Sequence, residues 1–279
     1  MKYGDLLDAR KICEGLKTEI VGRSVQCFDV LDSTNAYARK TAEIHFQEGM
    51  AIIADAQTSG RGRMGREWNS LPGAGIWMSI ILKPSLIPEK LNIISLGAAV
   101  SVVLAVMRAT GIAAGIKWPN DIVLGGRKVC GILAEMSSGI DKVDFLVLGI
   151  GINVNQDTLD FPDYLRNTAV SLKVFAEKTG MPAPEPGFDR NGLIREVLLE
   201  LDRIYKMINE GKNGEIIEEW RRQSATLGKK VRVCQGEREY AGTAVDVTEE
   251  GRLVVECNDG SMLEFISGEV SVRGMCGYI

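Results

Sequence analysis

The chain is poor in the residues that most often carry out covalent catalysis. It has a single histidine, His45, among 279 residues, which removes Ser-His-Asp and Cys-His catalysis from consideration. Its six cysteines are scattered and form no C-x-x-C pair, so their spacing favours neither a metal site nor a disulfide scaffold. We therefore expect buried free thiols in a reducing cytoplasm, and an exposed His45 at the end of a helix.

Long hydrophobic runs and a strong net charge are also missing. Residues 1–18 mix charges with apolar residues, unlike a secretory signal, and the most apolar stretch, 93–107, is too short to cross a bilayer. A net charge of −4 argues against a general nucleic-acid binder, which normally presents a basic surface. We expect a cytoplasmic globular protein that binds neither DNA nor a membrane.

The sequence does contain one loop in which arginine alternates with glycine, from Gly60 to Arg66. Glycine lets backbone N–H groups approach a ligand, and the planar, charged arginine fork matches phosphate and carboxylate oxygens. The whole loop runs from about Thr58 to Gly75, and internal loops of this length are usually functional or disordered. Because the run is single and internal, a loop that holds a small polyanion is favoured over a solvated loop or an RNA-binding tail.

Hydrophobic periodicity predicts an α+β fold with a second, smaller domain. Strands are expected at 25–31, 51–57 and 76–82, and an antiparallel meander over 113–155 with turns at Gly125-Gly126 and Ser138-Gly139. Helices are expected at 5–16, 32–46, 91–107, 169–179, 193–209 and 214–222. Five short strands after about Leu227 predict a small closed β-barrel. The predicted domains are 1–225 and 226–279.

Strand 143–155 has an unusual face. Alternation places Gly149, Gly151, Asn153 and Asn155 on one side, which is bare backbone ending in carboxamides. This face leaves room for a flat group, with a donor and acceptor pair to recognise its edge. A close helix–strand contact, with an asparagine capping the strand end, explains the pattern equally well.

A second polar cluster is Lys117-Trp118-Pro119-Asn120-Asp121, followed by Lys128 after a glycine hairpin. The proline interrupts the ladder, so its neighbours turn away from regular pairing. The Lys128 amine is placed to reach back over a pocket, although a solvated hairpin lysine is the commoner fate of a lone lysine.

In order and spacing, these segments resemble the biotin–protein ligases over roughly residues 30 to 155. The matching motifs are Ser33-Thr34-Asn35, Gln57 with Gly60 to Arg66, Lys117 to Asp121 with Lys128, Gly131-Ile132-Leu133, and Gly149-x-Gly151-x-Asn153. The last strands are similar to the family's SH3-like barrel. The resemblance implies a mixed or antiparallel sheet with flanking helices, as in class II aminoacyl-tRNA synthetases, followed by that barrel.

The resemblance also implies a two-step activity. Biotin and ATP give biotinyl-5′-AMP and pyrophosphate, and a lysine of a biotin carboxyl carrier protein of a carboxylase then takes the biotin. Mg²⁺ is expected to travel with ATP, without a separate metal site. The attack on the α-phosphate needs charge neutralisation rather than a protein nucleophile, which fits a chain without a catalytic histidine.

By resemblance, the site residues form three overlapping groups. Those expected to act in catalysis are Lys128, Arg63 and Asp121. Those expected to bind biotin are Ser33, Thr34, Asn35, Gln57, Gly60, Arg61, Gly62, Arg63, Lys128 and Gly131. Those expected to bind ATP or the adenylate are Arg61, Arg63, Arg66, Trp68, Asn120, Asp121, Lys128 and Asn153. The long loop is expected to order over the adenylate and exclude water.

Departures from the family bear on the alternatives. Only 32 residues precede Ser33, too few for the family's DNA-binding helix-turn-helix domain and its linker, so we expect a ligase without repressor function. A non-enzymatic biotin sensor would need such a DNA-reading element. A lipoate–protein ligase has similar fold and chemistry, but its arginine–glycine motif carries a histidine that is missing here. A homodimer is left open.

Overall fold

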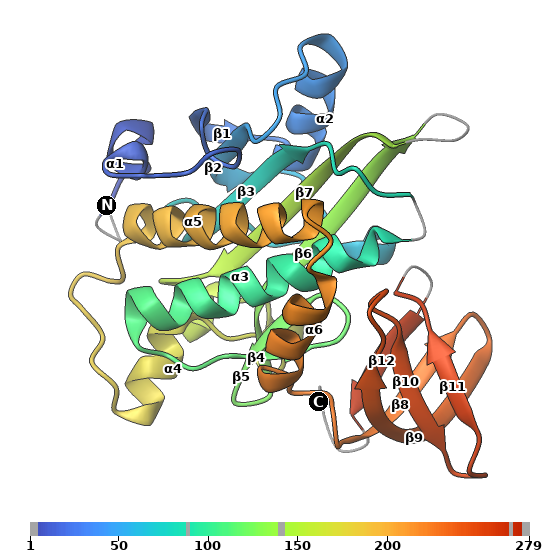
Figure 1. Cartoon of the computed structure of the whole chain (residues 1–279). Helices are drawn as coiled ribbons and strands as arrows, with labels where there is room; N and C mark the ends of the chain where they lie inside the picture. Colours follow the sequence, from blue (N-terminus) through green and yellow to red (C-terminus); the bar gives the residue numbers. More distant parts are fainter. Residues whose placement is uncertain (1–4, 88–89, 139–142, 268–269, 275–279) are drawn as a thin grey trace.

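A seven-stranded mixed sheet forms the centre of the computed structural model, which describes residues 5–87, 90–138, 143–267 and 270–274 (Figure 1). The strand order is β1-β2-β3-β7-β6-β5-β4; β1 and β2 run parallel, and the other neighbours run antiparallel. The strands are β1 Val25–Leu31, β2 Ala51–Gln57, β3 Gly75–Leu82, β4 Gly115–Lys117, β5 Asp121–Leu124, β6 Arg127–Ser138 and β7 Val143–Asn153. The predicted mixed sheet and its meander are confirmed, and the turn predicted at Gly139 lies outside the described residues.

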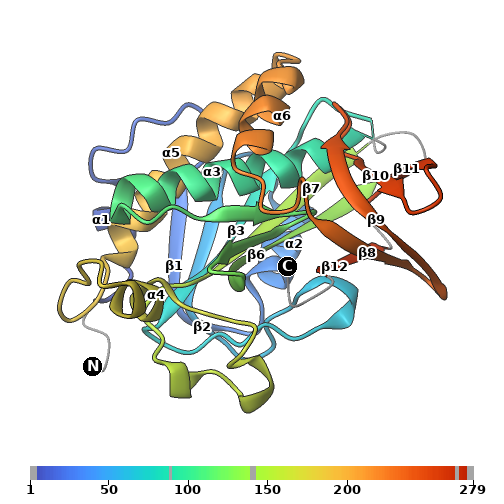
Figure 2. The same cartoon turned by 90° about the horizontal axis from the view of Figure 1, so that it is seen from below.

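Helices cover both faces of this sheet. They are α1 Ala9–Cys13, α2 Thr34–Ile44, α3 Asn92–Thr110, α4 Leu172–Thr179, α5 Arg190–Asn209 and α6 Asn213–Arg222. Figures 1 and 2 show α3, α5 and α6 together over one face. The other face packs against α2 through a separate apolar cluster that includes Ala38, Ile52 and Val147. Beyond the N-terminal end of α2, that second face carries the glycines of β6 and β7 and leaves room for a site.

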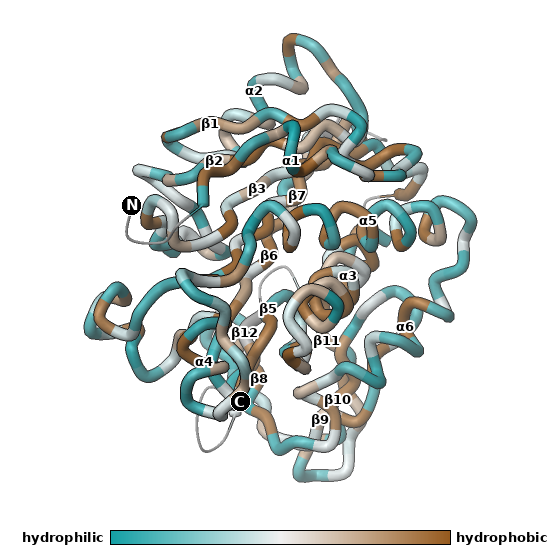
Figure 3. The backbone as a smooth tube through the Cα atoms, turned by 90° about the vertical axis from the view of Figure 1, so that its left-hand side faces the viewer, coloured by the Kyte–Doolittle hydropathy of each residue, from teal (hydrophilic) through white to brown (hydrophobic). Residues whose placement is uncertain are grey.

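Helix α3 has the composition of a membrane span but is a core element of this fold. Its most apolar window has a mean hydropathy of 2.0, and 67% of that window is buried inside the structure. Figure 3 shows hydrophobic residues concentrated along α3 and the nearby strands. Gly97 allows α5 to approach, because a Cβ there would lie 2.7 Å from Ile204 Cγ2. The helix is longer than the predicted 91–107, and its C-cap is Gly111, whose φ is 72°.

Two predicted helices are shorter than the periodicity suggested. The helix predicted at 5–16 forms only over Ala9–Cys13, because Asn191 holds the preceding residues extended: its carboxamide accepts from Asp8 N and donates to Leu6 O. The helix predicted at 169–179 begins at Leu172, after Ser171 caps it and Val170 N pairs with Lys128 O. In both places tertiary hydrogen bonds override local propensity.

The last part of the chain is a five-stranded antiparallel sheet of order β11-β10-β9-β8-β12. Its strands are β8 Lys230–Gln235, β9 Arg238–Val247, β10 Leu253–Cys257, β11 Met262–Phe265 and β12 Val270–Gly274. All five predicted strands are present; in the described residues no ladder joins β11 to β12, so hydrogen bonds there do not close the barrel. Trp118 docks this sheet on the first, since its Nε1 donates to Gly251 O at 3.1 Å.

The cysteines are less buried than the sequence suggested. Cys13, Cys27, Cys130, Cys234 and Cys257 are free, but Cys130 alone among them is fully buried and Cys13 is exposed. Cys276 lies outside the described residues. Burial raises the pKa of the Cys27 thiol to about 11, so it carries no thiolate near neutral pH. His45 is exposed at the C-cap of α2, as predicted.

Candidate functional site

A cavity of about 900 Å³ opens on the glycine-bearing face of the large sheet. Several elements form its walls. They are the start of α2, the loop of residues 58–75 (the arginine loop), β6, β7, the hairpin of β4 and β5, the segment 161–169, and β12 of the second sheet. Every predicted site residue except Gly60 lines it, and Gly60 lines an adjoining hollow of the same loop. The fold therefore brings motifs from distant parts of the chain to one place.

Hydrogen-bonded amides and hydroxyls form one end of the cavity. Gln57 Oε1 accepts from Thr34 N at 2.8 Å and from Thr34 Oγ1 at 3.1 Å, while Gln57 Nε2 donates to Ser70 Oγ at 2.7 Å. Ser33 caps α2, with its Oγ 3.4 Å from Ala36 N. Gly60 allows this packing, because a Cβ there would lie 2.4 Å from Trp68 O. The polar groups at this end are fixed by the protein before any ligand arrives.

A buried row of polar side chains continues behind Thr34. Ser79 Oγ lies 2.8 Å from Thr34 Oγ1 and 2.6 Å from Asn35 Oδ1, and Asn35 Nδ2 donates to Glu135 Oε2 at 2.6 Å. Gly149 makes space for the Asn35 carboxamide, since a Cβ there would lie 2.2 Å from Asn35 Oδ1. Asn35 is therefore used to hold the start of α2 against β3 and β6.

The flat group on the glycine face is the indole of Trp68, from the arginine loop. A Cβ on Gly151 would lie 2.6 Å from Trp68 Nε1, and one on Gly131 would lie 2.7 Å from Trp68 Cζ3. Trp77 packs edge-on against Trp68, with ring centroids 6.4 Å apart. Asn155, predicted to share this face, lies beyond the end of β7 and instead exchanges hydrogen bonds with the backbone of Phe188, in the segment before α5.

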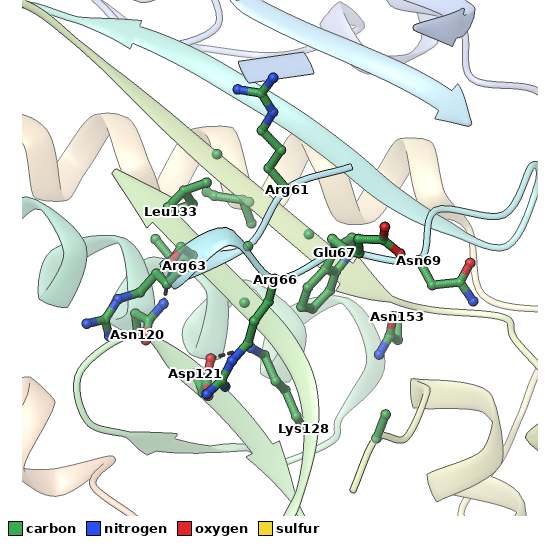
Figure 4. Close-up of a pocket in the computed structure, with 18 of the residues that line it drawn as sticks. Arg61, Arg63, Arg66, Glu67, Asn69, Asn120, Asp121, Lys128, Leu133 and Asn153 are labelled. Carbon is green, nitrogen blue, oxygen red and sulfur yellow. Dashed lines mark hydrogen bonds and ion pairs between the residues drawn. The ribbon is translucent and has the colours of Figure 1, made fainter. Parts of the chain in front are cut away.

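Positive charge gathers at the other end of the cavity (Figure 4). Lys128 Nζ pairs with Asp121 Oδ1 at 2.6 Å and lies 5.0 Å from the Trp68 ring centroid. The Arg66 side chain points toward this pair, whereas the Arg61 side chain points away from it (Figure 4). Lys128 is thus not a solvated hairpin lysine, and the Arg61 guanidinium does not join the cationic cluster.

The arginine loop folds as a small hairpin. Trp68 N donates to Gly60 O at 2.9 Å and Gly62 N donates to Arg66 O at 2.7 Å, and the tip, Arg63–Gly65, is a short 3₁₀ turn. Met64 at this tip has a φ of 56°, a left-handed conformation that costs energy for a residue other than glycine.

Arg63 connects the hairpin tip to both sheets. Its Nη1 donates to Asn120 Oδ1 at 2.9 Å, and its Nη2 donates to the carbonyl of Ser267, which follows β11. Asn120 Nδ2 in turn donates to Ile132 O, which fixes the turn between β4 and β5. Burial lowers the pKa of Arg63 from its ordinary value, with Asp121 opposing, but a guanidinium remains charged near neutral pH.

Lys117 is the most deeply buried cation of the cavity wall, with 4% of its surface exposed. Burial lowers its pKa to about 8; Asp121 opposes the shift, and Lys128, Arg273 and Arg66 add to it. An anion bound here would restore the charged form.

The described part of the chain holds no cluster of three or more His, Cys, Asp or Glu side chains suited to a metal ion.

The pH dependence of stability should report this buried amine. Between a pKa of about 8 in the folded chain and the ordinary value of 10.5, the unfolded chain binds more protons. The free energy of unfolding should therefore rise with pH across that window and level off below it. Replacing Lys117 with methionine should remove a rise of at most roughly 3 kcal/mol. Urea unfolding of both proteins at several pH values measures the difference, and parallel curves would exclude this shift.

Comparison with known proteins identifies the family. Residues 27–153 match the biotin/lipoate A/B protein ligase family, and residues 226–273 match the biotin protein ligase C-terminal domain. The bifunctional ligase/repressor BirA of Bacillus subtilis is 39% identical over 254 residues, which cover 91% of this chain and 76% of that protein. The chain belongs to the biotin protein ligase family. The biotin–[acetyl-CoA-carboxylase] ligase of Mycobacterium tuberculosis is 34% identical over 232 residues, covering 81% of this chain and 80% of that protein.

A solved member of the biotin protein ligase family has the same fold. The biotin protein ligase from Aquifex aeolicus in complex with biotin and ATP superposes with a TM-score of 0.73 at 31% identity, covering 90% of this chain and 99% of that one. The α+β fold, with its C-terminal antiparallel β domain, is therefore that of a biotin protein ligase, and the chain is an enzyme of the ligase class.

Several polar residues that hold the side chains or the loop of this ligase site in place were missed by sequence reasoning. They are Ser70, Ser79, Glu135 and Gln156. Ser79 interrupts the otherwise apolar strand β3, and Glu135 interrupts the apolar run from Val129 to Met136 of β6. This pattern indicates an inward-facing polar contact and could have been used. Gln156 follows β7 in a polar stretch, and only the tertiary contact with Asn153 marks it.

Proposed function

We propose that this ligase joins biotin to ATP as biotinyl-5′-AMP and passes the biotin to a lysine of a biotin carboxyl carrier protein. The observation that carries the proposal is one cavity that runs from fixed amide and hydroxyl groups, past the Trp68 indole that lies on Gly131 and Gly151, to a cluster of lysines and arginines. Biotin has the same order of parts: a ureido ring, an apolar ring and chain, and a carboxylate.

The polar end suits the ureido ring, which presents two N–H donors and a carbonyl acceptor. The Thr34 hydroxyl oxygen has acceptor capacity there, and the Ser33 hydroxyl can serve as a donor. Gln57 Oε1 already accepts from both Thr34 N and Thr34 Oγ1, so Gln57 holds Thr34 in place for the ligand. Because these protein groups are buried and already oriented, little conformational entropy of their side chains is lost when a ligand pairs with them. The indoles of Trp68 and Trp77 suit the apolar middle of the ligand.

The cationic end suits a carboxylate meeting a triphosphate. The ammonium of Lys128 lies beside Gly131 and the Trp68 ring, where the carboxylate of an extended biotin would arrive. Lys117, Arg63 and Arg66 surround the adjacent space for phosphates. Negative charge that develops at the α-phosphate is neutralised by these groups, and no protein nucleophile is required.

Mg²⁺ would reach this site chelated by the triphosphate. Asp121 and Glu67 are the carboxylates among the described cavity-lining residues, and Asp121 is the one beside the cations. A carboxylate and phosphate oxygens are suitable magnesium ligands. In our proposal Asp121 orients Lys128 through their ion pair, and it is also available to the metal.

Biotin-dependent ATP–pyrophosphate exchange tests the first step. We expect exchange with biotin and background exchange with lipoate, because the polar end offers several hydrogen-bond partners that a dithiolane ring cannot use. Lipoate-driven exchange of equal rate would favour the lipoate–protein ligase alternative, and a gel shift with biotin and ATP tests the non-enzymatic regulator.

Replacing Gln57 with alanine should weaken biotin binding. Gln57 holds both the backbone and the hydroxyl of Thr34, so its loss leaves buried partners unsatisfied and costs about 1–3 kcal/mol. Calorimetry with biotin alone should show about a tenfold or greater loss of affinity. Gln26 on β1 lies outside the cavity, and Gln26→Ala is the matched control. Unchanged affinity in Gln57→Ala would move the ureido ring elsewhere.

The finer features of the function are also proposals. We propose residues 1–225 as the catalytic domain and 226–279 as the barrel domain, acting in the cytoplasm without a DNA or membrane partner. The hydrogen bond from Arg63 to the carbonyl of Ser267 supports a role for the barrel domain in holding the arginine loop over the cavity. Size-exclusion chromatography with light scattering tests the homodimer.

A further inference from the structure

Behind the cavity wall, a buried glutamine holds a cavity-lining asparagine. Gln156 is 2% exposed and Asn153 is 5% exposed, and Gln156 Nε2 donates to Asn153 Oδ1 at 3.2 Å. Gln156 does not line the cavity itself, whereas Asn153 does (Figure 4). The other side of the Asn153 carboxamide donates from Nδ2 to Val170 O at 3.2 Å.

A backbone carbonyl sets the polarity of this chain of hydrogen bonds. Val170 O can only accept, so Asn153 must turn its Nδ2 toward it. Asn153 Oδ1 then faces Gln156, which must present its own Nε2. Val170 is in turn fixed, because its N–H donates to Lys128 O at 2.9 Å.

The side-chain oxygen of Gln156 shows that Asn153 imposes the orientation of the Gln156 carboxamide. Gln156 Oε1 is buried and has no hydrogen-bond partner among the described residues. Such a group is costly, yet rotating the carboxamide would bring Oε1 against Asn153 Oδ1, which is also an acceptor. The backbone carbonyl of Gln156 is held separately by Ser171 Oγ at 2.7 Å.

With its orientation locked, Asn153 keeps one Nδ2–H and one Oδ1 lone pair for a ligand. An asparagine carboxamide pairs with adenine by accepting from N6 and donating to a ring nitrogen. Guanine carries an acceptor, O6, in place of the N6 amine, so a carboxamide in the same orientation would place oxygen against oxygen.

We propose that Gln156 is a positioning residue that fixes the Asn153 carboxamide and thereby sets the preference for adenine over guanine nucleotides. This inference rests on the proposed function, because it uses Asn153 as the adenine contact. Gln156 acts without touching the nucleotide. Its effect is confined to the choice and affinity of the base, not to biotin or to the chemical step.

Gln156→Met tests the proposal because it keeps the side-chain length and removes the donor. In ATP–pyrophosphate exchange we expect the KM for ATP to rise about tenfold or more, with kcat within about twofold, and the preference for ATP over GTP to fall by a similar factor. Biotin affinity, measured without nucleotide, should not change. Asn153→Ala should show the same loss, and the double variant should add little to it.

Gln156→Glu adds a readout that a merely structural role would not move. In this variant the ionised carboxylate can only accept, and it would repel Asn153 Oδ1, whereas the protonated acid regains a donor. The KM for ATP of this variant should therefore fall as the pH is lowered toward the carboxyl pKa, unlike that of the native protein or Gln156→Met.

Asn155→Ala is the matched control for lost buried hydrogen bonds. Asn155 is fully buried two residues from Asn153 but bonds to the backbone of Phe188. We expect it to lower the melting temperature while keeping the ATP preference. If Gln156→Met keeps the native KM for ATP and the native base preference, the inference is wrong. If the native protein itself shows no biotin-dependent exchange, the proposed function fails instead.

Discussion

Replacing Lys128 with alanine should lower the rate of biotin-dependent pyrophosphate exchange by about 10²–10³-fold. The ammonium lies beside Gly131 and Asp121, where it would first attract the biotin carboxylate and then neutralise negative charge that develops at the α-phosphate. Because that interaction strengthens toward the transition state, kcat should fall more than ATP affinity. Lys128→Arg should rescue only part of the rate, since a planar fork cannot occupy the position of a compact ammonium.

Lys117→Ala is the comparison that decides which lysine acts. Lys117 is buried in the wall with a lowered pKa, whereas Lys128 is a quarter exposed and paired with Asp121. We expect Lys117→Ala to weaken ATP binding and to retain most of the chemical rate. A Lys128→Ala enzyme with near-native exchange, beside an inactive Lys117→Ala enzyme, would transfer the catalytic role to Lys117.

Replacing Arg63 with glycine should let the adenylate escape before transfer. Arg63 joins the hairpin tip to Asn120 and to Ser267, which follows β11, so its loss frees the loop at the point where it would cover the intermediate. Hydrogen bonds to a charged group are worth about 1.5–3 kcal/mol, so adenylate release should be faster by about ten- to a hundredfold. Released biotinyl-adenylate should biotinylate bystander lysines, as detected on a blot of an unrelated protein mixture.

Arg61→Gly controls for the effect of a second glycine in the loop. The Arg61 side chain points away from the cationic cluster (Figure 4). We expect its replacement to change bystander labelling much less than Arg63→Gly does. Equal labelling by both variants would mean that the positive charge of the loop retains the adenylate, and that the Arg63 hydrogen bonds to Asn120 and Ser267 do not.

Patterns that depend on neighbouring residues were predicted well. The strand predicted at 25–31 is β1 with those bounds, and the helix predicted after it forms as α2, with Ser33 as its N-cap. Gly111 ends α3 because a left-handed φ of 72° suits glycine. The residues of the polar motifs also line one cavity, because the start of α2, the loops and hairpins at strand ends, and the glycines inside β6 and β7 lie on the same face of the sheet.

Features set by long-range contacts could not be predicted in this way. Asn191 keeps the first residues extended, although their local pattern favours a helix. The glycine face of β7 left either a flat neighbour or a close helix–strand contact open, and the sequence does not reveal that Trp68 from the same chain packs there. Gln156 looks like any polar loop residue until Val170 O fixes the Asn153 carboxamide between them.

Intact-mass measurement of an acceptor domain tests the proposed reaction most directly. The purified chain is incubated with ATP, Mg²⁺, biotin and a biotin carboxyl carrier domain, and the carrier is then analysed by mass spectrometry. The proposal predicts one added biotinyl group on a single carrier lysine, dependent on both ATP and biotin, and none when lipoate replaces biotin. An unmodified carrier under conditions where the chain binds biotin, or a carrier that gains lipoate instead, would contradict it.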